Sequence, residues 1–167
     1  MQNHLKEILQ ELTERGVQFV VCGGVAVVLH GVERMTLDLD LVVEMSRENL
    51  QRFIDAMRAL NLTPRVPVMP EALLDETSRR KMREEKGALV FTFQDIKNPF
   101  RQVDIFLTNE PSFQTLNEDA EKVDVNGFSV SIASPLKLIE MKRKVNPMRA
   151  KDIQDINFLI NKIQRQR

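Results

Sequence analysis

The sequence predicts an α+β fold in which a mixed sheet is flanked by helices and followed by a C-terminal helical segment. Three observations support this prediction. Apolar runs of strand length alternate with stretches of helical spacing, an Asn-Gly turn joins two alternating segments, and two helical stretches close the chain. Its 167 residues, 43% of them hydrophobic, suit one domain with its own core. We expect that domain over 1–167, with a core of about 1–132 and helices over about 134–165.

The first part of the chain alternates helices and strands. Residues 3–15 have helical spacing and end at Gly16, a residue common directly after helices. Ser46 precedes a third helical stretch as a cap. In order, the expected elements are helix 3–15, strand 17–22, a short helix from Gly23-Gly24 to about Gly31, strand 37–45 and helix 46–61.

The second part adds two strand pairs and two helices. A loop with three prolines at 63–70 leads into a polar helical stretch up to about Lys86. The strands 88–93 and 101–107 flank an Asn-Pro turn, and 122–132 alternates apolar and polar residues about Asn-Gly, the strongest short hairpin signal. A helix starts at Ser134-Pro135, and after Asn146-Pro147 a last helix runs over about 148–163. We expect the helices mainly on one face of the sheet.

Acidic residues interrupt two of the predicted strands. Asp38 and Asp40 share one face of strand 37–45, with Cα atoms ~6.6–6.8 Å apart. Asp104 lies on the corresponding face of strand 101–107 and joins the pair if the two strands are neighbours. Carboxylate oxygens favour Mg²⁺ or Mn²⁺, so these three acids are candidate metal ligands and catalytic residues. A solvated strand face is the alternative explanation of each.

Gly23 and Gly24 come between an apolar strand and a short helix, shortly before the acidic pair. Glycines let a backbone approach a ligand closely, and helix N-termini attract phosphate. A phosphate site beside paired carboxylates is what nucleotide–metal chemistry requires. The alternative is an ordinary tight turn.

Basic residues concentrate near the C-terminus, although lysine plus arginine equals aspartate plus glutamate at 24 each. Residues 133–167 carry nine Lys or Arg against three acids. On a helical projection Lys142 falls inside the apolar arc, Arg149 and Asp152 lie on the apolar stripe of the last helix, and Lys151 points away. Inward-facing cations need acidic or phosphate partners; the alternative is that they reach solvent and Arg149 pairs only with Asp152. The expected stripe consists of Ile153, Ile156, Leu159, Ile160 and Ile163.

Two segments, "GGVAVVLHGVERMTLDLDLVV" and "SPLKLIEMKRKVNPMRAKDIQDI", together with Asp104, resemble a known family. Gly-Gly followed by Asp-x-Asp and a later acid on a strand is similar to nucleotidyltransferases with the polymerase-beta-type palm. The two segments together resemble the small bacterial AbiEii-type toxins of that superfamily. Many superfamily members have Ser where this chain has Gly24, so here only the backbone is offered at that position.

The resemblance implies a set of site residues. Gly23 and Gly24 would bind the triphosphate of a nucleotide. Further nucleotide-binding residues would be Arg34, Thr36, Lys142, Arg149, Lys151 and Asp152. The metal ligands and catalytic acids would be Asp38, Asp40 and Asp104, with Mg²⁺ or Mn²⁺ as cofactor and a nucleoside triphosphate (NTP) as substrate.

The predicted function is transfer of a nucleoside monophosphate to an acceptor hydroxyl, with release of pyrophosphate. A catalytically silent nucleotide-binding module of the same fold, and a plain interaction domain, are the alternatives. A tRNA 3′ end, a protein hydroxyl and a small molecule such as an aminoglycoside stay open as acceptors, and the basic C-terminal segment favours a macromolecule. The family also implies a cognate antitoxin as partner. One cysteine and the lack of an apolar run of ~18 residues favour the cytoplasm and no membrane.

Overall fold

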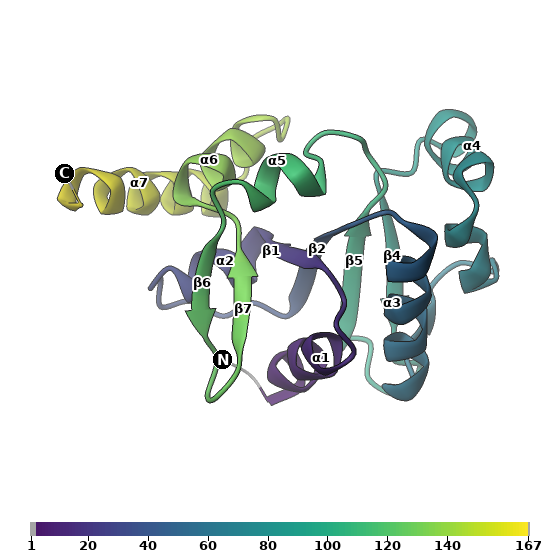
Figure 1. The fold of residues 1–167 in the computed structure, drawn as a ribbon. Helices are drawn as coiled ribbons and strands as arrows, with labels where there is room; N and C mark the ends of the chain where they lie inside the picture. Colours follow the sequence, from purple (N-terminus) through teal and green to yellow (C-terminus); the bar gives the residue numbers. More distant parts are fainter. Residues whose placement is uncertain (1–2, 167) are drawn as a thin grey trace.

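The computed structural model describes residues 3–166. Its strands are β1 Phe19–Cys22, β2 Asp38–Val43, β3 Thr63–Pro64, β4 Val90–Gln94, β5 Gln102–Phe106, β6 Glu121–Asp124 and β7 Ser129–Ile132. They form one seven-stranded sheet in the order β3-β4-β5-β2-β1-β7-β6 (Figure 1). β2 is antiparallel to β1 but parallel to β5, and β1 is parallel to β7. The predicted mixed sheet is confirmed.

Both predicted strand pairs are present. β4 and β5 are antiparallel, and so are β6 and β7. In the turn between β6 and β7, Asn126 has φ 52° and Gly127 has φ 105°. These left-handed conformations are the ones that Asn and Gly adopt most readily, which is why this dipeptide marks the hairpin.

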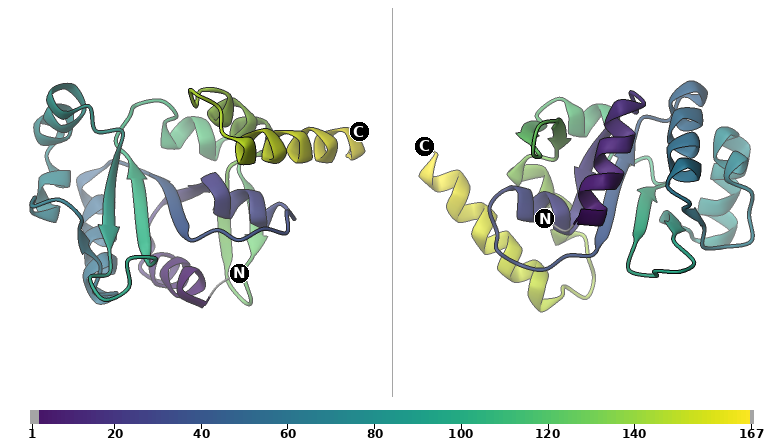
Figure 2. Two further views of the ribbon diagram at one scale, coloured as in Figure 1. Left: turned by 180° about the vertical axis from the view of Figure 1, so that it is seen from behind. Right: turned by 90° about the horizontal axis from the view of Figure 1, so that it is seen from below.

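Helices lie on both faces of the sheet. They are α1 Asn3–Glu14, α2 Gly23–Leu29, α3 Arg47–Ala59, α4 Glu76–Lys86, α5 Phe113–Asn117, α6 Pro135–Arg143 and α7 Ala150–Arg165, with a 3₁₀ helix η1 Pro70–Leu74. α1 and α3 contact each other and cover one face (Figure 1). α2, α6 and α7 lie on the opposite side and leave β4 and β5 uncovered there (Figure 2, left).

The expectation of helices mainly on one face was therefore wrong. The second face is not polar throughout, since Val20 and Val42 lie on it beside Asp40 and are both buried. Apolar residues on that face need a covering layer of their own. No helix within the described residues is both long and apolar enough to cross a membrane.

Two short elements, β3 and α5, were not predicted, and the helical stretch expected up to about Lys86 is divided into the short η1 and α4. β3, η1 and α5 each have only two to five residues, which is below the length at which periodicity is informative. One side chain was also misplaced. Ile153 was expected in the buried stripe of the last helix but is 48% exposed, whereas Ile156 and Leu159 are buried. The first turn of α7 instead turns Asp152 and Asp155 inward.

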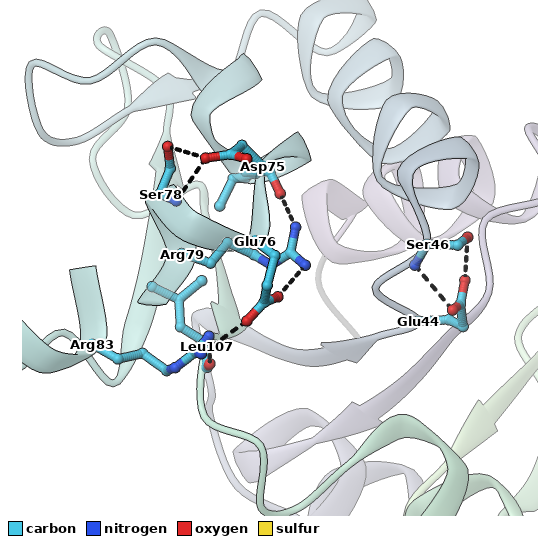
Figure 3. A network of polar contacts seen from close by, with 9 residues as sticks. Glu44, Ser46, Asp75, Glu76, Ser78, Arg79, Arg83 and Leu107 are labelled. Atoms are coloured by element: carbon cyan, nitrogen blue, oxygen red, sulfur yellow. Dashed lines mark hydrogen bonds and ion pairs between the residues drawn. The ribbon is translucent and has the colours of Figure 1, made fainter. Parts of the chain in front are cut away.

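Two arginines hold helix α4 in place, Arg79 against η1 and Arg83 against the end of β5. Arg79 is buried and donates to the carbonyl of Leu73, and Arg83 donates to the carbonyl of Leu107 directly after β5, at 3.1 Å. Both arginines pair with Glu76 (Figure 3). The helix starts at Asp75, whose carboxylate accepts from the backbone N–H of Ser78, as an N-cap does.

Candidate active site

The sheet brings the three predicted carboxylates onto one surface. Because β2 and β5 are adjacent and parallel, Asp40 is directly opposite Asp104, and Asp38 is opposite Gln102. Residues two apart on a strand share a face, so Asp38, Asp40 and Asp104 all project to the same side. That side is the one on which α6 and α7 lie, and part of it is open.

These acids repel one another. The pKa of Asp40 is raised to about 6, first because the side chain is buried and then because of the Asp104 and Asp38 charges; Lys142 and Arg149 lower it to a smaller extent. Burial is also the main reason that the pKa of Asp104 is raised. Within residues 3–166, no ion pair joins any of the three acids to a base. Such a site favours either a proton or a cation between its carboxylates.

Gly23 makes room for Asp40. Its φ is +59°, and a Cβ placed on it would lie 1.9 Å from Oδ2 of Asp40. A side chain at this position would collide with the carboxylate and would also strain the backbone. Gly23 is therefore required both by the backbone conformation of the turn and by the position of the Asp40 carboxylate.

Gly24 makes room for two other predicted site residues. A Cβ on it would lie 2.6 Å from Oγ1 of Thr36 and 2.9 Å from Nη2 of Arg34. Both side chains therefore lie over the start of α2, where residue Cys22 at the N-cap supplies no side-chain hydrogen bond. Nε of Arg34 is buried and has no hydrogen-bond partner in the described structure. A donor without a partner at such a place suits an anionic oxygen.

A network of ion pairs links the remaining predicted residues. Nζ of Lys142 lies 3.2 Å from Asp152 and 2.8 Å from Asp155, and all three side chains are buried. Asp155 also pairs with Arg34 at 3.0 Å. The network therefore connects the loop before β2 to both C-terminal helices.

Arg149 extends this network toward solvent. It donates to both oxygens of Asp152, at 2.6 and 3.1 Å, while its own side chain is 55% exposed. Burial tends to raise the pKa of Asp152, but the hydrogen bonds from Arg149 and Lys142 outweigh this and leave that pKa lowered. Lys151 is exposed. Lys151 therefore lies apart from the cluster, as the helical projection predicted.

A cavity of about 570 Å³ adjoins both sets of residues. Gly23, Asp40, Lys142 and Arg149 all line it. Phe106 of β5 and residues of α6 form an apolar wall. The cavity thus combines a carboxylate surface, a cationic surface and an apolar surface, as a site for a charged molecule with an apolar part requires.

The donor set fits a hard divalent cation. Asp38, Asp40 and Asp104 offer only oxygen atoms, and the missing Cβ of Gly23 leaves the place that the Asp40 carboxylate occupies. Among the described residues, however, no group of three or more His, Cys, Asp or Glu side chains is placed so that it could hold a metal ion by itself. An open arrangement is what Mg²⁺ uses when a substrate supplies further ligands.

Two residues at the site were not identified from the sequence, Asp155 and Thr92. Asp155 is three residues after Asp152 and so on the same helix face, a spacing that could have indicated it. Oγ1 of Thr92 donates to Oδ1 of Asp104 at 2.5 Å. Thr92 is a polar residue between Phe91 and Phe93 on a strand, which is the same signal that identified Asp104.

Known structures share this fold. A lincosamide antibiotic adenylyltransferase, LnuA, superimposes with a TM-score of 0.64 and 16% identity over 95% of this chain and 96% of that one. The antibiotic-resistance factor ANT(2″)-Ia superimposes with a TM-score of 0.62 and 15% identity, over 96% of this chain and 82% of that one. A nucleotidyltransferase-like protein from Paracoccidioides brasiliensis superimposes with a TM-score of 0.52 and 17% identity, over 94% of this chain and 74% of that one.

No curated protein sequence matches the chain. The sequence model of one family matches residues 7–166, which is nearly the whole chain. That family is described as the nucleotidyl transferase AbiEii toxin of the Type IV TA system. The predicted resemblance is confirmed: the chain belongs to the AbiEii family of nucleotidyltransferase toxins.

Proposed function

We propose that this nucleotidyltransferase is Mg²⁺- or Mn²⁺-dependent and that Asp38, Asp40 and Asp104 hold the metal. The observation that carries the proposal is the register of β2 and β5, which sets Asp40 opposite Asp104 on a surface shared with Asp38. A divalent cation bound there would stabilise charge on the attacking and leaving oxygens of a phosphoryl transfer.

The chain's own residues supply the other requirements. We assign the triphosphate to the region of Gly23 and Gly24, with Arg34, Lys142 and Arg149 offsetting its charge. Arg34 has a buried Nε–H to offer, and Lys142 and Arg149 line the cavity beside Asp40. Thr36 supports this assignment because its hydroxyl lies against Gly24.

Asp104 is our candidate for the general base. Its carboxylate would accept the proton of an acceptor hydroxyl, whose oxygen forms a bond to the α-phosphorus while the bond to the pyrophosphate oxygen breaks. The products are the nucleotidylated acceptor and pyrophosphate. The raised pKa of Asp104 favours this role, since a stronger base takes a proton more readily.

Thermal melting tests the site without knowledge of the acceptor. The wild type, Asp38→Asn/Asp40→Asn and the control Asp124→Asn are melted with each metal and each of the four NTPs. A ligand at ~100 times its dissociation constant adds ~2.7 kcal/mol, or several degrees. We expect a metal-dependent shift in the wild type and the control and none in the double variant. Equal behaviour of all three proteins in every combination would contradict the proposal.

The acceptor class is tested with the nucleotide that this assay selects. We propose a macromolecular hydroxyl as acceptor, because the basic C-terminal helices border the site. Radiolabelled NTP is incubated with cell RNA, with cell protein and with lincomycin or tobramycin. Lincomycin is bound in the LnuA structure, and adenylyl-2″-tobramycin is bound in a structure of ANT(2″)-Ia. Label on an antibiotic alone would contradict the macromolecular acceptor while leaving the transferase proposal intact.

We also place the protein in a toxin–antitoxin pair of the cytoplasm, with a cognate antitoxin as its partner. Family membership and the single buried cysteine support this. Expression of the wild type should arrest growth, and the Asp38→Asn/Asp40→Asn variant should not. Growth arrest by both the wild type and the variant would contradict toxicity through nucleotidyl transfer.

A further inference from the structure

Thr92 and Asp104 form a cross-strand pair at the centre of the proposed site. They are direct partners in the antiparallel register of β4 and β5. Oγ1 of Thr92 donates to Oδ1 of Asp104 at 2.5 Å, and both side chains are partly buried. Side chains directly opposite each other in such a pair are close enough to form a hydrogen bond of this kind.

The backbone of Thr92 is fixed on two sides. Toward β5 it belongs to the ladder that pairs it with Asp104. Toward the loop after β3, its carbonyl accepts from the backbone N–H of Arg65 at 2.9 Å. A hydroxyl carried by a β-branched residue on a strand held from both sides has little freedom, because such residues are stiff at χ1.

This hydrogen bond matters because a carboxylate rotates easily. The terminal torsion of an aspartate is broad and has no sharp staggered minima. Asp104 also lies on the same face as two other acids, Asp40 and Asp38, whose negative charges repel its own. Without a fixed donor, its carboxylate would turn away from them. With Oδ1 held by Thr92, its other oxygen remains available to a cation or an acceptor hydroxyl.

We propose that Thr92 is a positioning residue, whose hydroxyl fixes the Asp104 carboxylate for metal binding. This inference rests on the proposed metal site. It assigns a role to a residue on β4, an element that carries none of the acids. Thr92 touches neither metal nor substrate in this account and acts only through Asp104.

Direct Mn²⁺ binding, measured by electron paramagnetic resonance, tests the inference without an acceptor. We compare the wild type with Thr92→Val, Thr92→Ala and Thr92→Ser, and with Thr63→Val on exposed β3 as the matched control. Loss of an outer partner of a metal ligand typically lowers metal affinity ~10–100-fold. We expect that loss for the Val and Ala variants, recovery to within a few-fold for Ser, and no change for Thr63→Val.

The same variants on an Asp104→Asn background separate positioning from general weakening. If Thr92 acts through Asp104, Thr92→Val should lower Mn²⁺ affinity no further once Asp104 is replaced. Thermal melting confirms that each variant is folded. Wild-type affinity in folded Thr92→Val and Thr92→Ala would overturn the role of Thr92 alone. Absence of Mn²⁺ binding by the wild type, with and without NTP, would overturn the metal site and this inference together.

Discussion

Replacing Asp40 by Asn should stabilise the metal-free protein. An Asp pKa of about 6 in the folded chain, against an ordinary value of 3.8, corresponds to about 3 kcal/mol of disfavoured charge above pH 7. The side chain is only partly buried by surface exposure, and an Asn amide is itself desolvated there, so we expect about half of this figure. For a protein of this size that is a rise in melting temperature of roughly 3–6 °C.

The pH dependence identifies the cause. A carboxylate whose pKa is raised in the folded chain destabilises the fold wherever the unfolded chain is ionised, so the effect grows from about pH 4 upward and is complete above pH ~7. The melting difference between Asp40→Asn and wild type, measured in EDTA, should therefore be largest at pH 7.5 and fall to about a fifth at pH 4. The control Asp124→Asn should show no such trend. A variant that melts lower than wild type at pH 7.5, or a difference independent of pH, would refute the reasoning.

Three further changes test other parts of the site and its support. Gly24→Ala places a methyl group 2.6 Å from the Thr36 hydroxyl and should lower the free energy of unfolding by about 1–3 kcal/mol in urea titrations, with partial recovery in Gly24→Ala/Thr36→Ala. Asp155→Asn leaves Lys142 buried with one acid fewer and should destabilise by about 3 kcal/mol; a urea midpoint equal to that of wild type would contradict a structural ion pair. The pKa of His30 is lowered by burial, so its contribution to stability is present above pH 6.5 and lost as the pH falls. The stability advantage of wild type over His30→Gln should shrink between pH 7.5 and 5.5, and a constant advantage would contradict this.

The longer elements of the fold were predictable because their patterns are local. The hairpin followed from Asn126 and Gly127, and helix α3 from Ser46, whose hydroxyl accepts from the N–H of Asn49. Periodicity could not place helices on the second face of the sheet, since which apolar residues lie beside Asp40 depends on the pairing of β1 with β2. Nor could it indicate that Arg79, in a polar helix, is buried against a carbonyl.

In the candidate site, too, the features set by local sequence were predictable and those set by distant contacts were not. Asp38 and Asp40 are on one face by strand geometry alone, whereas their meeting with Asp104 depended on strand order, which the sequence leaves open. The partners of Lys142 were predicted as acids or phosphate, and the described structure supplies two acids. The pairing of Arg34 with Asp155 joins residues that are 121 positions apart, so no local pattern could indicate it.

The parallel ladder between β2 and β5 has a consequence for how the protein folds. Asp40 and Asp104 are distant in sequence, and a slip of one residue between their strands would direct Asp104 to the opposite face. A partly folded chain therefore lacks the three-acid surface altogether. A ligand that bridges the two strands would bind only the chain in which both are paired. It should therefore slow the amide hydrogen exchange that occurs through global unfolding, and not only the exchange of one local segment. Metal affinity in this protein would thus report whether β2 and β5 have paired in the native register. The sequence of either strand alone does not show that pairing.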